Sequence, residues 1–216
     1  MRDVVLMSDS RVGAIPVEEC GEPLHDVRGR LRMDDRLRDH EGAYAQLRSG
    51  LLDRLLQAQR LLPDGYRLLV VEGFRPKDLQ RKYFDEYASE LRAAHRDWSE
   101  EQLRVAASRY VAPIEVAPHI AGAAVDLTLC TEDGEELDLG TPVNATPEAS
   151  AGRCYTAAEG IGAEATHNRR IMAAALEPAG LVNYPTEWWH WSYGDRYWAM
   201  SVGARAAIYD FADYPA

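Results

Sequence analysis

Leucines recur at helical spacing between residues 43 and 62. The apolar stripe consists of Leu47, Leu51, Leu55 and Leu62, with Leu52 and Leu56 beside it. Positions three and four apart lie on one face of a helix, so this spacing predicts an amphipathic helix over residues 43–62. The turn residues Pro63-Asp64-Gly65 follow directly and end it.

Three further segments have helical character. Residues 77–97 are rich in helix formers, and residues 164–177 are stopped by Pro178 and Gly180. Ser99, with Gln102 three residues later, is typical of a capping box. We therefore expect another helix to begin after Ser99 and to run toward Tyr110.

Short apolar runs predict the strands. Residues 66–71 form a short apolar run, which is typical of a buried strand. Residues 123–129 alternate, with Val125, Leu127 and Leu129 on one face and Asp126 and Thr128 on the other. A hairpin-type turn at residues 132–134 follows, and residues 187–193 read as an aromatic strand.

The order of these elements favours an α+β fold, in which hairpin-linked strands form a central, mainly antiparallel sheet flanked by helices. Residues 141–162 predict a long loop that could cover a site. We expect a single domain over residues 1–216, in which residues 1–42 are a divergent N-terminal segment. No apolar stretch approaches the roughly 20 residues of a membrane span, and no signal peptide is evident, so a cytoplasmic location is expected.

Charge and cysteine content narrow the classes of partner. The formal net charge is −11 and the pI is about 5.0. A nucleic acid or an anionic membrane surface would need a basic face, so neither is expected as a partner. Cys20, Cys130 and Cys154 form no paired motif and read as reduced structural thiols. The sequence leaves the oligomeric state open.

Three residues are candidate metal ligands. His119 stands at the mouth of the strand over residues 123–129, and Asp126 lies seven residues on, on its polar face. Gly122 leaves the backbone room to bring the two together. A third candidate, His190, follows Glu187 by three residues. Positions three apart on a strand face opposite sides, so Glu187 and His190 need a twist or bulge to share one site.

Two histidines and one carboxylate make a catalytic-type zinc set with a fourth position for water. A free carboxylate such as Glu187 then serves as general base. Arg75, at a strand end, could bind a substrate carboxylate or an oxyanion, although it could also pair with an acidic neighbour. Spacing alone leaves the metal site no stronger than the alternative of ordinary polar residues. The remaining histidines read as surface or satisfied core residues: His25, His40, His95 and His167.

In these motifs the sequence resembles the D-alanyl-D-alanine dipeptidases of the vancomycin-resistance type, which are zinc peptidases related to D,D-carboxypeptidases. Three segments carry the resemblance in the family's order: Gly73-Phe74-Arg75-Pro76, then Ala117-Pro118-His119-Ile120-Ala121-Gly122-Ala123-Ala124-Val125-Asp126-Leu127-Thr128-Leu129, then Glu187-Trp188-Trp189-His190. Asn168-Arg169-Arg170 is also similar to the family. The likeness runs from about Leu68 to the C-terminus and implies a Hedgehog/DD-peptidase-like zinc peptidase fold.

The resemblance also implies roles. One zinc ion per chain would be held by His119, Asp126 and His190, with Glu187 as catalytic base and Arg75 stabilising the oxyanion. The substrate would be a small peptide of the D-Ala-D-Ala type.

The expected substrate-binding residues are Asn144, Ala117, Pro118 and Trp189. Departures from the family fall on the first three of them. Ala117 and Pro118 replace serines that lie beside the dipeptide in the family. Asn144 falls where the family places an Asp that meets the substrate ammonium, which weakens selection for a free N-terminus. An N-blocked or different small peptide, a D,D- or L,D-carboxypeptidase and a non-catalytic zinc-binding domain therefore remain as alternatives.

Overall fold

A five-stranded sheet forms the centre of the fold in the computed structural model, which describes residues 4–214. Its strands, in spatial order, are β2 (Arg32–Met33), β4 (Tyr66–Glu72), β5 (Ala124–Thr131), β7 (His190–Ser192) and β6 (Val182–Asn183). β2 runs parallel to β4, whereas the other neighbours are antiparallel. The α+β fold with a mainly antiparallel central sheet is thus confirmed.

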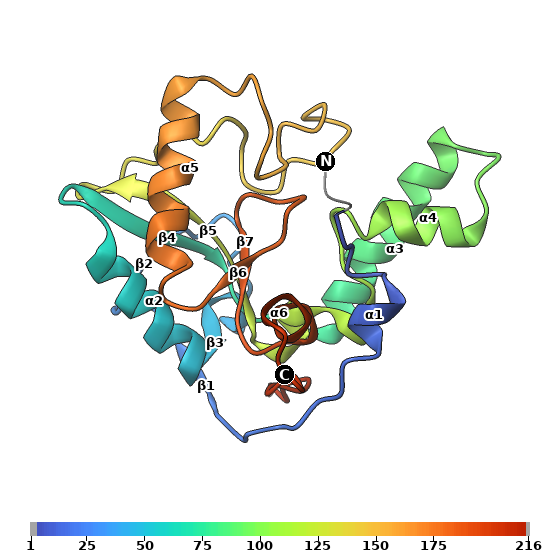
Figure 1. The fold of residues 1–216 in the computed structure, drawn as a ribbon, viewed down its shortest axis with the longest axis horizontal. Helices are drawn as coiled ribbons and strands as arrows, with labels where there is room; N and C mark the ends of the chain where they lie inside the picture. The colour runs from blue at the N-terminus through green and yellow to red at the C-terminus, as the bar shows by residue number, and fades with distance from the viewer. Residues whose placement is uncertain (1–3, 215–216) are drawn as a thin grey trace.

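Two long helices cover the sheet. α2 (Ser49–Leu61) and α5 (Ala163–Leu176) pack beside each other on the core (Figure 1). Leu51 and Leu55 of α2, Met172 of α5, and Leu127 and Trp189 from the sheet side are all buried in one apolar cluster. Burial of such side chains is the main term that stabilises a fold of this kind.

The helix predicted over residues 43–62 begins only at Ser49, which corrects the expected start. Residues 43–45 form the 3₁₀ turn η1 (Ala43–Ala45), and β3 (Gln46–Arg48) pairs with β1 (Leu24–Asp26) in a second, two-stranded sheet. The carbonyls of Tyr44 and Gln46 also accept the amides of Gly73 and Phe74, at 2.6 and 2.7 Å. These tertiary hydrogen bonds outweigh the local helical pattern.

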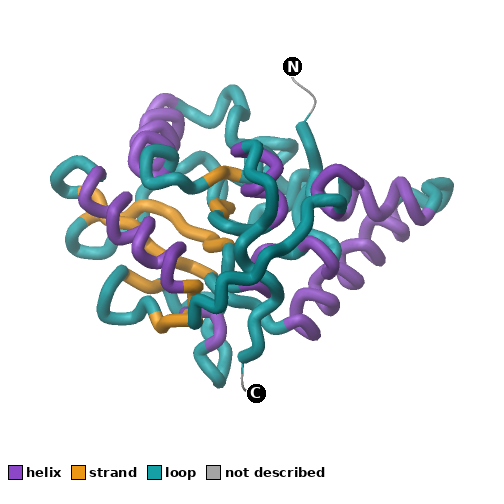
Figure 2. The backbone as a smooth tube through the Cα atoms, turned by 60° about the horizontal axis from the view of Figure 1, so that its bottom comes forward, coloured by secondary structure: helices purple, strands orange, loops and turns teal. Residues whose placement is uncertain are grey.

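α3 (Lys77–Ala94) and α4 (Glu100–Ala107) form an arm that projects away from the central sheet (Figure 2). The two helices enclose an apolar cluster of their own, which includes Tyr87, Leu91 and Leu103. The capping box is confirmed, because the Ser99 hydroxyl accepts the Gln102 amide and the Gln102 side chain accepts the Ser99 amide. α4 ends at Ala107, before the expected Tyr110.

The remaining elements are short: α1 (Ser10–Gly13), η2 (Ile114–Val116), η3 (Pro118–Ala121) and α6 (Arg196–Val202). The turn at residues 132–134 is present, and Gly134 donates to the Thr131 carbonyl at 3.0 Å. The long loop over residues 141–162 contains no helix or strand, as expected. The aromatic strand is shorter than predicted, because β7 begins at His190 rather than at residue 187.

Within residues 4–214 the helices are all too short or too polar to cross a membrane. The cytoplasmic location and the single-domain assignment stay predictions from the sequence.

Candidate metal centre and active site

His119 lies in η3, immediately before β5. Gly122 ends that turn with φ of 64°, a left-handed conformation that favours glycine, and a Cβ there would lie 2.4 Å from Leu24. The Nδ1 atom of His119 is 2.6 Å from the Gly73 carbonyl oxygen, so it is the protonated donor. The Nε2 atom is therefore the free acceptor, and it faces Asp126 and His190.

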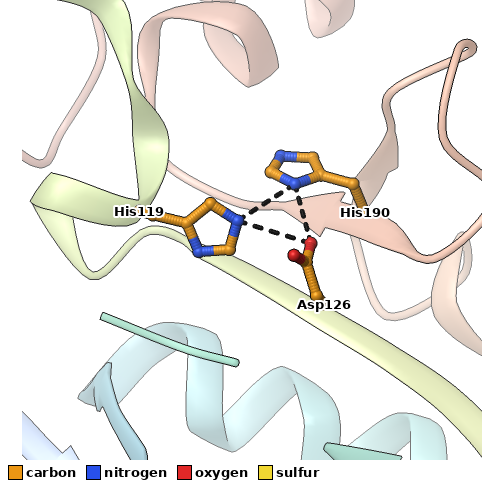
Figure 3. Close-up of side chains that lie close together, drawn as sticks. All are labelled: His119, Asp126 and His190. Carbon is orange, nitrogen blue, oxygen red and sulfur yellow. Dashed lines mark hydrogen bonds and ion pairs between the residues drawn. The ribbon is translucent and has the colours of Figure 1, made fainter. Parts of the chain in front are cut away.

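Asp126 and His190 are direct cross-strand partners on β5 and β7. The Oδ1 atom of Asp126 lies 3.0 Å from His190 Nδ1 and 3.3 Å from His119 Nε2. The two imidazole nitrogens are 3.2 Å apart (Figure 3). Three donor atoms from three separate segments therefore meet at one point.

This donor set fits a metal ion. All three side chains are buried, and their ligand atoms lie within 4.8 Å of one another. Although burial opposes it, the two imidazoles hold the pKa of Asp126 well below its usual range, so the carboxylate is charged. Two nitrogens and one carboxylate oxygen match a catalytic zinc site, which keeps a position free for water. The expected ligands are thus brought together.

Glu187 reaches the same site from a turn, not from a strand. Its amide donates to the Tyr184 carbonyl at 2.9 Å, and its carbonyl accepts the Asn183 side chain at 2.9 Å. The turn removes the strand alternation that would separate Glu187 from His190, and it places Glu187 Oε2 3.8 Å from His190 Nδ1. Burial, with the charge of Asp126, raises the pKa of Glu187 well above its usual value, which favours a proton-accepting role near neutral pH.

Arg75 follows β4 and is held firmly on the wall of the site. Glu72 accepts from its Nε at 2.9 Å and from Nη2, and Gln80 accepts from Nη1 at 2.8 Å. Its Nη2 atom is 3.9 Å from Asp126 Oδ2. Glu72 and Asp126 raise the pKa of Arg75 against the opposing effect of burial. Pairing with an acidic neighbour was the alternative to a role in the site, and Glu72 is that neighbour. The pair does not remove Arg75 from the site, because Arg75 also lines the cavity.

One cavity of about 370 Å³ connects these groups. His119, Asp126, His190, Glu187 and Arg75 all line it.

The expected substrate-binding residues divide into two pairs. Pro118 and Asn144 belong to the cavity lining. Ala117 and Trp189 are not in the part of that lining formed by residues 4–214, and Trp189 packs edge-on against Trp188 in the core. Their contribution to substrate binding stays a prediction.

Sequence reasoning assigned no role to several residues in the lining. Glu72 lies opposite Asp126 in the sheet and forms an ion pair with Arg75. Its position three residues before Arg75 was the sequence feature that could have indicated this pair. Gln80 and Tyr83 lie on the first turns of α3, where Tyr83 stacks 5.0 Å from the Arg75 guanidinium. Their positions depend on how α3 packs, which no local motif encodes.

Comparison with known proteins agrees with this geometry. A family model described as D-ala-D-ala dipeptidase matches residues 48–210. A D-alanyl-D-alanine dipeptidase from Synechocystis sp. is 29% identical, with 89% of this chain and 90% of that protein covered. One from Enterococcus faecium is 30% identical, with 67% and 71% covered. A vancomycin-resistance D,D-pentapeptidase solved with Zn(II) has 17% identity and a TM-score of 0.45, over 88% of this chain and 90% of that one.

The family match covers all the expected ligands, together with Glu187 and Arg75. The enzyme class expected from the motifs is confirmed, and His119, Asp126 and His190 form a donor set that fits the expected zinc ion. This chain belongs to the D-alanyl-D-alanine dipeptidase family of metallopeptidases.

Proposed function

We propose that this chain hydrolyses a small dipeptide of the D-Ala-D-Ala type, with one zinc ion held by His119 Nε2, Asp126 Oδ1 and His190 Nδ1. The observation that supports this is the convergence of the three donor atoms at 3.0–3.3 Å beside Glu187. A structural zinc site is closed by four protein ligands. Here three residues form the donor group, and Glu187 stands beside them with its Oε2 3.8 Å from His190 Nδ1.

A zinc ion held by His119, Asp126 and His190 would supply Lewis acidity toward the attacking water and the scissile carbonyl. Glu187 accepts the proton of the attacking water and passes it to the leaving amine. Its burial favours both transfers, because its raised pKa lies closer to neutral pH.

Arg75 stabilises the developing oxyanion in this proposal. A guanidinium has five N–H donors, and within residues 4–214 Glu72 and Gln80 accept from three of its N–H groups. The others can reach substrate oxygen. Because Glu72 and Gln80 fix the guanidinium beforehand, little reorganisation is needed during the reaction.

A second candidate, the same reaction on an N-blocked small peptide, is favoured by Asn144. Its side chain is a neutral amide on the cavity wall. Its backbone is held in place by a hydrogen bond from Tyr110 Oη to its carbonyl oxygen at 3.0 Å. A neutral amide gives a substrate ammonium no charge partner. Free D-Ala-D-Ala and its N-acetyl form therefore distinguish the two candidates.

The decisive experiment measures zinc content and hydrolysis in the same preparations. We expect the wild-type protein to hold one zinc per chain and to cleave D-Ala-D-Ala. Glu187→Gln should retain that zinc and lose hydrolysis by at least about 10²-fold, the lower range for a general base. His95→Gln, at the C-terminal end of α3, serves as the control and should behave as wild type. Unchanged turnover in Glu187→Gln contradicts the proposed base, and a zinc-free protein that cannot be reloaded contradicts the metal site.

A further inference from the structure

Three polar atoms that lie close together in the sequence are buried without a hydrogen-bond partner in the described part of the chain. They are His190 Nε2, Ser192 Oγ and Asp195 Oδ2. All belong to the six residues that lead from β7 into α6. Buried polar atoms without a partner are rare in folded proteins because each costs stability. Three such atoms within six residues suggest that they serve as hydrogen-bond partners for one another.

The tautomer of His190 follows from its orientation. Its Nδ1 atom faces Asp126 and His119, while the opposite side of the ring points away from them (Figure 3). A nitrogen that binds a metal carries no proton, so the proton of the neutral ring is on Nε2. This buried N–H therefore requires an acceptor.

Asp195 can supply that acceptor. It is the N-cap of α6, and its Oδ1 accepts the amides of Tyr197 and Trp198 at 2.7 and 3.2 Å. Its Oδ2 atom takes no part in the cap and is buried, and the whole residue is only 3% exposed. One carboxylate oxygen thus serves the helix and the other remains available.

Ser192 lies between His190 and Asp195 in the chain. Residues two apart on a strand face the same side, so Ser192 and His190 share one face of β7. The Ser192 side chain is 1% exposed, and a hydroxyl can donate one hydrogen bond while accepting another.

His190 and Asp195 each contribute to the pKa of the other. Burial lowers the pKa of His190, and Asp126 and Asp195 both oppose that shift. Burial raises the pKa of Asp195, and Ser192, the α6 amides and His190 act in the opposite direction. His190 and Asp195 thus influence each other reciprocally.

We infer that Asp195 is a positioning residue, together with Ser192. The free Oδ2 of Asp195 accepts a hydrogen bond from the Nε2–H of His190 and holds Nδ1 toward the metal site. A carboxylate behind a ligating histidine fixes its tautomer and makes it a better ligand. The inference rests on the proposed ligation by His190, but not on which peptide is cleaved.

The test uses Asp195→Asn in the full chain. An Asn side chain keeps the volume and the capping oxygen, so α6 retains its N-cap, but it removes the charged acceptor. Zinc affinity is measured by competition with a chelator, and the tautomer by long-range ¹H–¹⁵N spectra of histidine-labelled, zinc-loaded protein. We expect zinc affinity to fall by about 10- to 100-fold and the exchange-protected Nε2 proton of His190 to shift or disappear.

Two further variants separate positioning from simple loss of structure. Ser192→Ala should weaken zinc binding in the same direction but less, and it keeps the inference testable if Asp195→Asn does not fold. Ser99→Ala removes the cap of α4 away from the site and should leave zinc affinity unchanged.

Zinc affinity equal to wild type in Asp195→Asn would overturn the inference. A loss of affinity with an unaltered His190 Nε2 signal would also overturn it, because the carboxylate would then act through space only. Neither readout uses a peptide, so an incorrect substrate assignment leaves the test valid.

Discussion

His119 and His190 present different ring nitrogens to the same point, and the backbone decides which. Gly73 binds His119 through Nδ1, so Nε2 is left for the metal. His190 sits opposite Asp126 in the sheet and offers Nδ1 instead. A Cβ on residue 73 would lie 2.4 Å from the Gln46 carbonyl oxygen. A larger residue would therefore shift the backbone at this position and move the residue 73 carbonyl away from His119. The identity of one glycine thus affects a ligand that lies 46 positions along the chain.

At Asn144 we predict a change of selectivity. Asn144→Asp restores a carboxylate to the cavity wall, and Asp tolerates the left-handed φ of 65° found there. A charge-assisted hydrogen bond contributes about 1.5–3 kcal/mol. The ratio of kcat/KM for free over N-acetylated D-Ala-D-Ala should therefore rise about 10- to 100-fold, as steady-state assays would show.

Gln57→Glu adds the same charge on the exposed side of α2 and should leave that ratio unaltered. An equal ratio in Asn144→Asp and wild type would show that this position does not contact the substrate N-terminus.

At the scale of elements, α5 organises the long loop that carries Asn144. Arg169 is buried, and it donates to the carbonyls of Leu139, Tyr155 and Arg153 at 2.7–2.8 Å. Burial lowers the pKa of Arg169 to about 10, so the side chain remains charged at neutral pH. Arg169 thereby holds the loop over residues 141–162 against α5.

Arg169→Met should loosen this loop. The substitution keeps an apolar stem but leaves three carbonyls without their donor, and an unsatisfied buried group costs about 1–3 kcal/mol. We expect a loss of at least about 2 kcal/mol in the free energy of unfolding, measured in urea, together with a raised KM. Arg170→Met, on the exposed side of the same helix, should change neither quantity appreciably. Equal effects in both variants would contradict the role of Arg169.

Glu22 links three segments of the chain, which are its own loop, the start of α2 and the C-terminal segment, and its contribution to stability depends on pH. It accepts the Gly50 amide at the start of α2 at 2.7 Å, the Ser49 hydroxyl at 3.2 Å and the Tyr209 hydroxyl at 2.6 Å. Partial burial opposes ionisation, but these bonds outweigh it and hold the pKa of Glu22 below its usual value of 4.5. A carboxyl with a lowered folded-state pKa stabilises the fold above its unfolded-state pKa and loses that effect as pH falls through the folded-state value.

Glu22→Gln should therefore be less stable than wild type at pH 7, and the gap should narrow as pH falls below about 4.5. Urea unfolding midpoints of the two proteins across pH 3–7 measure this gap. Glu135→Gln, at an exposed position, gives the baseline. A gap that is constant over the whole range would show that the ionised form of Glu22 is not the stabilising one.

For the whole molecule, the metal centre links segments that lie far apart in the chain. His119 precedes β5, Asp126 lies on β5 and His190 lies on β7. A ligand that binds only the folded chain stabilises it by mass action. We therefore expect zinc bound at these three residues to stabilise the entire fold.

Removal of zinc should lower the melting temperature. Zinc at about 1,000 times its dissociation constant contributes about 4 kcal/mol, which corresponds to roughly 8–16 °C for a chain of this size. Calorimetry of the protein before and after dialysis against a chelator measures the change. Restored zinc should return the original melting temperature, and His119→Ala should show a much smaller shift. An identical melting temperature with and without the metal would contradict a site built from these three ligands.

The sequence by itself determined the donor set and most elements. The alternation over residues 123–129 placed Asp126 on the face opposite Val125 and Leu127, and the capping box at Ser99 placed α4, because both signals are local. The ordered motifs pointed to His119, His190, Glu187 and Arg75, and all four residues line one cavity in the folded chain.

Tertiary structure alone decided how Glu187 approaches the metal and where α2 begins. The turn before His190 depends on contacts with residues distant in sequence, such as the bond from the Trp188 amide to the Cys154 carbonyl at 3.0 Å. Residues 43–48 follow a helical pattern, yet they are held as a turn and strand by backbone bonds to residues 24–26 and 73–74. Local periodicity reports which side chains share a face, whereas hydrogen bonds between distant segments decide which backbone conformation is kept.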